Sequence, residues 1–257
     1  MSEELVQVEH RGPIAIVTLN RPEALNALSR ALSAGIAQAF ADLAGRPDTR
    51  IAILTGNGRA FCAGLDLKEL ASGENGMQAA DEEQGAGHRR FGMAAFPGLI
   101  IAAINGFALT GGLELALCCD IRIAARGAKF ADTHGRVGVI PGGRMSALLP
   151  RLIGLGRAKA MSLSGNMIDA ETAERWGLVD QLVEPEALMA EALALAETIA
   201  ANDPDVMRRY NALIEENYGM SYAQAVDNEH LRSREANQRF DRAAVNPEAI
   251  ANRARNA

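Results

Sequence analysis

The sequence predicts an α/β fold built on parallel strands. Short runs rich in isoleucine, valine and alanine alternate with stretches in which apolar residues recur at helical spacing. Strands that alternate with helices in this way usually pair in parallel, and their ligands bind at the loops that follow the strands. Two of the loops expected here are rich in glycine.

The first half of the chain carries the predicted strands. Residues 14–19 form the first strand, which ends at the turn residues Asn20, Arg21 and Pro22. A helix is predicted over 29–44, with Ser29 as its N-cap. Further strands are predicted at 51–55, 99–104 and 120–125. The polar segment 71–90, which contains four glycines, is expected to be mobile.

The chain is expected to become helical after Pro150. Helices are predicted at 157–164, 170–176, 185–201, 204–217 and 222–240. No linker rich in proline or serine precedes them, so they read as a helical appendage to the core. We therefore expect a core over residues 1–200 and a C-terminal helical region over 201–257.

Composition limits the possible functions and compartments. With a net charge of −6 and only 4% aromatic residues, the chain offers neither a basic surface nor a stacking platform for nucleic acid. Its three cysteines, two of them adjacent, match neither a disulfide framework nor a metal site, and a reducing cytoplasm fits best. The sequence has neither a cluster of metal ligands nor a dinucleotide fingerprint, so no metal or redox cofactor is expected. The sequence shows neither a secretory signal nor a membrane-spanning run, and no membrane partner is expected.

The stretches 60–68 and 104–116 each combine glycines with an expected helix start. The first amides of a helix have no partner within it, and they point outward at its positive end. Two such amides, one from each turn, can hold one developing negative oxygen. Glu114 falls in the first turn of the second helix if that helix opens near Gly111, where it would serve either as a general base or only as an acidic residue completing the helix start.

Four motifs in order resemble the enoyl-CoA hydratase/isomerase, or crotonase, family. They lie at 19–28, 63–67, 103–112 and 176–179, and the resemblance covers nearly the whole chain. It implies a crotonase-like spiral of ββα turns. It also implies a C-terminal helical region that mediates trimer formation, commonly as a dimer of trimers.

The resemblance also implies an acyl-CoA thioester substrate and a set of binding residues. The amides of Leu65 and Gly111 match the family's oxyanion hole. Residues that match the coenzyme A contacts are Arg21, Ala24, Ala63, Asp66, Leu67 and Lys68. Arg21 and Lys68 would meet phosphates, or they are ordinary solvated charges. Cys62 lies within the motif and is expected to be a small apolar filler.

The chain departs from the family at the second catalytic position. Hydratases of the family use two glutamates; the first matches Glu114, and twenty positions later this chain has His134, with Asp132 as the nearest carboxylate. His134 is either an acid/base partner of Glu114 or a hydrogen-bonding residue that lines the pocket. Arg136 and Arg144 would place positive charge near the acyl group, or they lie on the surface.

Three activities are compatible with these residues. The expected one is hydration of a trans-2-enoyl-CoA to a 3-hydroxyacyl-CoA. Because the second glutamate is absent, another enolate reaction on an acyl-CoA (isomerisation, decarboxylation or hydrolysis) is an alternative. A third is a protein that binds acyl-CoA without turning it over.

Overall fold

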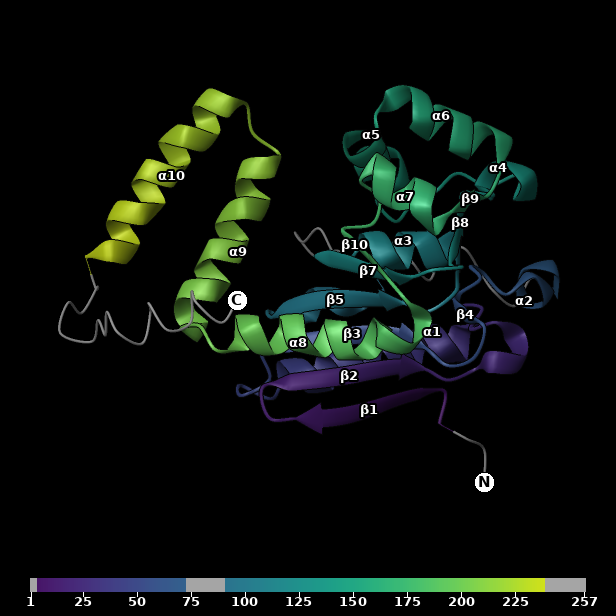
Figure 1. Ribbon diagram of the computed structural model, residues 1–257, viewed down its shortest axis with the longest axis horizontal. Coiled ribbons are helices and arrows are strands. Elements are labelled where there is room, and N and C mark those ends of the chain that lie inside the picture. Colours follow the sequence, from purple (N-terminus) through teal and green to yellow (C-terminus); the bar gives the residue numbers. More distant parts are fainter. Residues whose placement is uncertain (1–3, 73–90, 239–257) are drawn as a thin grey trace. The chain divides into compact units, whose positions relative to one another are not determined.

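The computed structural model describes residues 4–72 and 91–238 (Figure 1). The chain divides into two compact units, Met1–Pro204 and Asp205–Ala257. The segment expected to be mobile, 71–90, lies outside the described residues from position 73 onward.

A six-stranded sheet forms the centre of the first unit. Its strands, in spatial order, are β1 (Val6–Arg11), β2 (Ile14–Leu19), β3 (Ile51–Gly56), β5 (Leu99–Ile104), β7 (Ile121–Ala125) and β10 (Gln181–Val183). Only β1 runs antiparallel to its neighbour, and the other pairs are parallel. The four predicted strands and their parallel pairing are therefore confirmed.

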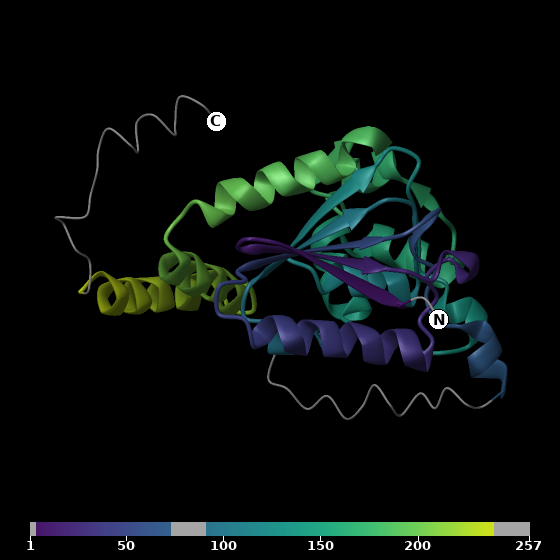
Figure 2. The ribbon, with the colours of Figure 1, turned by 90° about the horizontal axis from the view of Figure 1, so that it is seen from below.

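Two helices cover opposite faces of this sheet, as Figure 2 shows. They are α1 (Arg30–Ala44) and α8 (Leu188–Ala200). Successive side chains of a strand point to opposite faces, so Ile51 and Ile53 pack with α8 while Ala52 and Leu54 pack with α1. Ser29 accepts a hydrogen bond from the Leu32 amide at 3.1 Å, which confirms the predicted N-cap.

A second sheet of four short strands lies beside the first. It contains β4 (Ala60–Cys62), β6 (Phe107–Leu109), β8 (Lys129–Ala131) and β9 (Ile168–Asp169). The first three are parallel neighbours, and β9 runs antiparallel to β8. Strands of two or three residues are too short to show alternation, and the sequence did not predict them. Since β4, β6 and β8 are parallel, the segments that follow them emerge at one edge.

The remaining helices of the first unit pack around these sheets. The α-helices are α2 (Leu67–Ser72), α3 (Gly111–Leu117), α4 (His134–Val137), α5 (Met145–Ile153), α6 (Leu155–Ser164) and α7 (Ala170–Trp176), with 3-10 turns η1 (Pro22–Ala24), η3 (Met93–Ala95) and η4 (Pro185–Ala187). The helix predicted at 185–201 is divided between η4 and α8. The helices were expected to begin after Pro150, but α5 begins at Met145 and contains that proline. Proline has no amide hydrogen, so one hydrogen bond within α5 is not made.

The described part of the second unit is a helix pair, α9 (Pro204–Tyr218) and α10 (Tyr222–Asn237). Ser221 and Gln224 form a capping box at the start of α10. Across the pair, Asn228 donates to Asn217 at 2.8 Å. Both predicted helices are found, although positions 239–240 lie outside the described residues. Across the described parts of both units, no helix combines the length and hydropathy that a bilayer crossing requires.

Candidate active site

Three segments meet at the edge where β4, β6 and β8 end. The turn 63–66 follows β4, Thr110 and α3 follow β6, and Asp132, Thr133 and α4 follow β8. Both glycine-rich stretches singled out in the sequence therefore contribute to one place, together with the segment that carries His134. Parallel pairing of the three strands is what brings positions so far apart in the chain together.

The turns that carry Leu65 and Gly111 touch each other. Gly64 has a φ of +94°, a conformation open to glycine, and a Cβ added there would stand 2.8 Å from the Leu109 carbonyl oxygen. A Cβ on Gly111 would lie 3.6 Å from the Leu65 nitrogen. Gly111 is the first residue of α3, so its amide has no acceptor within that helix. The two amides assigned to the oxyanion hole thus belong to adjoining turns.

Thr110 joins the second and third segments. Its amide donates to the Ala131 carbonyl at 2.8 Å, and its hydroxyl is hydrogen-bonded to that of Thr133 and accepts from the Thr133 amide. The residue has φ +52° and ψ −112°, a conformation that a β-branched side chain disfavours. The surrounding hydrogen bonds hold this backbone, which directly precedes the Gly111 amide.

Glu114 lies in the first turn of α3, as the sequence predicted. Its Oε1 accepts a hydrogen bond from the Gly143 amide at 2.6 Å, and its Oε2 lies 3.4 Å from His134 Nε2. A Cβ on Gly143 would stand 2.9 Å from the Glu114 carboxyl carbon, so glycine is what allows this approach. The sequence analysis missed Gly143. The glycine pair after Pro141 is a signal that could have pointed to it.

His134 lies between two carboxylates. Its Nδ1 is 2.6 Å from Asp132 Oδ1, on the side of the ring away from Glu114. All three residues are buried, with exposed fractions of 6% for Glu114, 5% for His134 and 1% for Asp132. Burial disfavours the charged imidazole, but the hydrogen bonds and charges of Asp132 and Glu114 outweigh it and raise the pKa of His134 to about 9. His134 therefore carries a proton on both nitrogens at neutral pH.

A cleft of about 400 Å³ opens at the same edge, and Glu114, His134 and Asp132 are not among the residues that line it. All six residues matched to coenzyme A contacts line it: Arg21, Ala24, Ala63, Asp66, Leu67 and Lys68. Leu65, Thr110 and Thr133 line it as well, so it extends to the neighbours of Gly111 and His134 in the chain. Cys62 is fully buried, and burial raises the pKa of its thiol to about 12, which suits an apolar filler.

Arg21 and Asp66 form an ion pair in the wall of the cleft. Arg21 Nη1 lies 2.6 Å from Asp66 Oδ2 and also donates to the Ala27 carbonyl. Asp66 accepts from the amides of Lys68 and Glu69 as well, and its hydrogen bond with Arg21 is the main cause that holds the pKa of Asp66 below its usual range. Arg21 thus fastens the early loop to the turn that carries the Leu65 amide.

Replacing Arg21 by alanine should lower the free energy of unfolding by about 1–3 kcal/mol at pH 7, because Asp66 would stay buried without its charged partner. The pKa of Asp66 in the folded protein is lower than its ordinary value of 3.8. The difference in stability is therefore fully present above pH 3.8 and disappears as the pH falls through the pKa of Asp66 in the folded protein. Urea denaturation at pH 7 measures the loss of stability, and the same experiment at pH 3 measures how far it has diminished. Lys68→Ala, an exposed charge in the same cleft, should change stability by no more than about 0.5 kcal/mol. Equal stability of the two variants would contradict the assignment.

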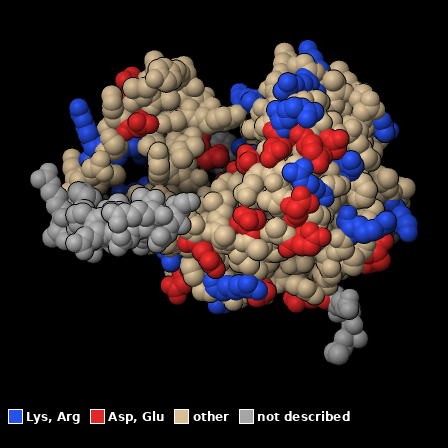
Figure 3. All heavy atoms as spheres, in the orientation of Figure 1, with Lys and Arg blue, Asp and Glu red and all other residues tan. Residues whose placement is uncertain are grey.

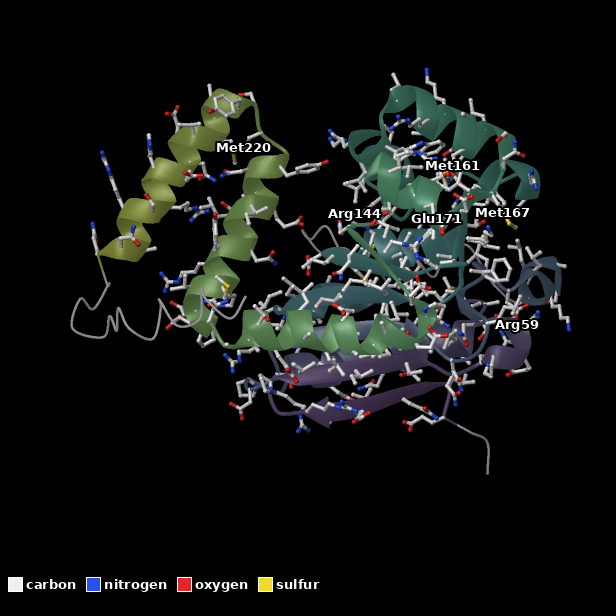
Figure 4. All side chains as sticks on the ribbon, viewed as in Figure 1. Arg59, Arg144, Met161, Met167, Glu171 and Met220 are labelled. Atoms are coloured by element: carbon white, nitrogen blue, oxygen red, sulfur yellow. The ribbon has the colours of Figure 1, made fainter. Side chains whose placement is uncertain are left out.

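Arg136 and Arg144 point at backbone carbonyls. Arg136 donates from Nε and Nη2 to the Ser164 carbonyl. Arg144, labelled in Figure 4, directly precedes α5 and donates to the Leu117 carbonyl at 3.3 Å. Neither residue is among those that line the cleft. On the face drawn in Figure 3, basic and acidic side chains of the described residues are interspersed.

Comparison with known proteins shows which family the chain belongs to. A sequence profile of the enoyl-CoA hydratase/isomerase family matches residues 9–244, and the chain belongs to that family. It is 42% identical to the (E)-benzylidenesuccinyl-CoA hydratase of Thauera aromatica over 77% of each chain. It is 39% identical to the mevalonyl-coenzyme A hydratase of Beauveria bassiana, over 75% of this chain and 71% of the relative.

Solved structures agree with this placement. An enoyl-CoA hydratase from Mycobacterium tuberculosis H37Rv superposes with a TM-score of 0.84 at 37% identity, covering 98% of this chain and 97% of that one. An enoyl-CoA hydratase from Geobacillus kaustophilus HTA426 gives a TM-score of 0.80 at 33% identity, covering 89% and 88%. The predicted crotonase fold is therefore confirmed.

Proposed function

We propose that this protein is an enoyl-CoA hydratase, which adds water to a trans-2-enoyl-CoA to give a 3-hydroxyacyl-CoA. The observation that carries the proposal is the buried pair of Glu114 and His134 beside the adjoining turns of Leu65 and Gly111. Relatives of this family that are 39–42% identical are named as hydratases of acyl-CoA substrates. The substrate itself brings the coenzyme A, and no further cofactor is part of the proposal.

The proposed chemistry follows from where charge develops. When water adds at C3, negative charge moves onto the thioester oxygen, and the Leu65 and Gly111 amides would stabilise it there. The Glu114 carboxylate, held by the Gly143 amide, takes a proton from the attacking water. His134, protonated at neutral pH, supplies the proton that C2 takes up. The hydroxyl ends on C3, and the enolate is discharged at C2.

Loss of the ultraviolet absorbance of the enoyl thioester tests the proposal directly. Purified protein should hydrate crotonyl-CoA or a longer trans-2-enoyl-CoA. Detectable binding of these substrates by calorimetry without turnover would overturn the hydratase and favour another enolate reaction or a protein that only binds acyl-CoA.

The second unit supports a proposal about assembly. Val206, Tyr210, Ile214 and Tyr218 recur every four residues along α9, and each is 51–56% exposed. Large apolar side chains in one stripe of a helix mark a contact surface. We infer a cytoplasmic homotrimer, or a dimer of trimers, in which this stripe is covered by neighbouring copies.

Replacing Tyr210 and Ile214 together by aspartate should reduce the assembly to monomers, because charge would enter a desolvated contact. Light scattering coupled to size-exclusion chromatography measures the mass. The exposed acidic pair Asp227→Asn and Glu229→Gln on α10 of the same unit is the matched control, and it should leave the mass unchanged. A wild-type chain that elutes as a monomer would contradict the proposal.

A further inference from the structure

Asp132 is a buried carboxylate to which the chemistry above gives no task. It is 1% exposed, and it accepts hydrogen bonds from the His134 amide at 3.2 Å, from His134 Nδ1 and from the Ser162 hydroxyl. Burial works against its charge, yet the bonds from His134 and Ser162 hold the pKa of Asp132 below its usual range. An ionised carboxylate only accepts, so the hydrogen between Asp132 and His134 belongs to Nδ1.

The orientation of the His134 ring determines which ring nitrogen faces Glu114. With Nδ1 protonated toward Asp132, Nε2 is the nitrogen 3.4 Å from Glu114 Oε2. Two lone pairs facing each other at a buried site would repel, so one proton lies between Nε2 and Oε2. In the resting state His134 carries it, in keeping with its raised pKa.

We propose that Asp132 is a positioning residue that holds His134 with Nε2 toward Glu114, so that the two residues share one proton and exchange it directly after each turnover. The proposal rests on the hydratase function inferred above. In this proposal, the Ser162 hydroxyl on α6 holds the Asp132 carboxylate in place, and Asp132 holds the orientation of the His134 ring. The ring then presents Nε2 to Glu114 on α3.

The exchange balances within one catalytic cycle. Water gives its hydroxyl to C3 and its proton to Glu114, while His134 gives its Nε2 proton to C2. The site is then left with protonated Glu114 and neutral His134, which still carries its proton on Nδ1. Transfer of the proton from Glu114 Oε2 to His134 Nε2 restores the starting state without a proton from bulk water.

The charges around His134 come from a small set of groups. Glu114 faces the ring from α3, and Asp132 faces it from the segment that leads into α4. From α6 the polar group is the neutral hydroxyl of Ser162, which reaches Asp132. The nearest basic residue on α4, Arg136, is bonded to the Ser164 carbonyl instead. The protonation of His134 is therefore set by the two carboxylates.

The test is Asp132→Asn, which keeps the size of the side chain and removes its charge. We expect kcat for crotonyl-CoA to fall by about 10–100-fold, because acid–base catalysis contributes that much or more. KM should stay within about twofold, since Asp132 is buried and does not line the cleft. In the wild type, activity should fall above about pH 9 as His134 loses its proton, and in the variant this limb should move toward 6.5. A merely structural role would leave the limb in place.

A second readout does not depend on turnover. The chain has four histidines, and comparison with His134→Gln identifies the imidazole signal of His134 in NMR spectra. Its titration midpoint should be near 9 in the wild type and lower in Asp132→Asn. Asp169→Asn, which changes an exposed N-cap of α7, is the matched control and should alter neither the midpoint nor kcat.

The outcomes separate the two proposals. If the wild type hydrates crotonyl-CoA but Asp132→Asn leaves both the alkaline limb and the midpoint unchanged, Asp132 does not position His134 and the inference is wrong. If the wild type binds acyl-CoA without hydrating it, the hydratase function fails. A midpoint that shifts in Asp132→Asn would then still support the positioning of His134 by Asp132, and an unchanged one would overturn it.

Discussion

Replacing Glu114 by glutamine should reduce hydration of crotonyl-CoA by about 10²–10⁴-fold. A carboxamide cannot take a proton from water, yet it has the shape of the carboxylate and can still accept from the Gly143 amide. The fold and the cleft should therefore survive. Turnover is followed by the absorbance of the enoyl thioester, and binding by calorimetry with butyryl-CoA, which cannot be hydrated.

Glu174→Gln is the matched control for this substitution. Glu174 is an exposed residue of α7 outside the cleft, and its replacement should leave turnover and binding unchanged. Full activity of Glu114→Gln would show that another group activates the water. Loss of both turnover and butyryl-CoA binding would instead assign Glu114 to binding.

Replacing Gly112 by alanine should lower the free energy of unfolding by about 3 kcal/mol or more. A Cβ at this position would stand 2.0 Å from the Cys62 carbonyl oxygen, a backbone atom of β4 that cannot rotate away. Either α3 or β4 must move, and both lead into the proposed oxyanion turns. Guanidinium unfolding followed by circular dichroism measures the change, and crotonyl-CoA turnover should fall with it.

Gly156→Ala provides the comparison within a helix. Gly156 lies in α6 with no atom within 4 Å of an added Cβ. Alanine gains roughly 0.5–1 kcal/mol over glycine in a helix, so this variant should be as stable as the wild type or slightly more stable. The difference between the two variants isolates the contact with Cys62. Equal unfolding midpoints would rule that contact out as the reason for glycine.

The long strands and the site turns could be predicted from sequence, and the second sheet could not. Runs such as 51–55 are buried on both faces and long enough to be identified from composition. β4, β6 and β8 have three residues each, fewer than periodicity needs. The two turns at the ends of β4 and β6 were nevertheless located, because they are rich in glycine, and the family resemblance then assigned the oxyanion amides to Leu65 and Gly111.

Side-chain partners were the harder part of the prediction. Arg21 and Asp66 were both assigned to the cleft, but their ion pair joins positions 45 residues apart, and only the fold brings them together. His134 was singled out because the family resemblance puts a second glutamate at this position, twenty residues after Glu114. Its contact with Asp132 depends on the local backbone at the start of α4, where residues two apart come within hydrogen-bond distance. The sequence placed these residues at the site without revealing how they pair.

Thr110 has a strained backbone, and its side chain maintains the geometry of the candidate site. Its backbone, with a positive φ, costs roughly 1–3 kcal/mol, and glycine would remove most of that strain. That exchange would also delete the hydroxyl that ties Thr133, and with it the His134 segment, to the residue before the Gly111 amide. Glycine at this position would therefore exchange backbone strain for unsatisfied groups on Thr133 at a cost of similar size, so the variant should lose catalytic efficiency without gaining thermal tolerance.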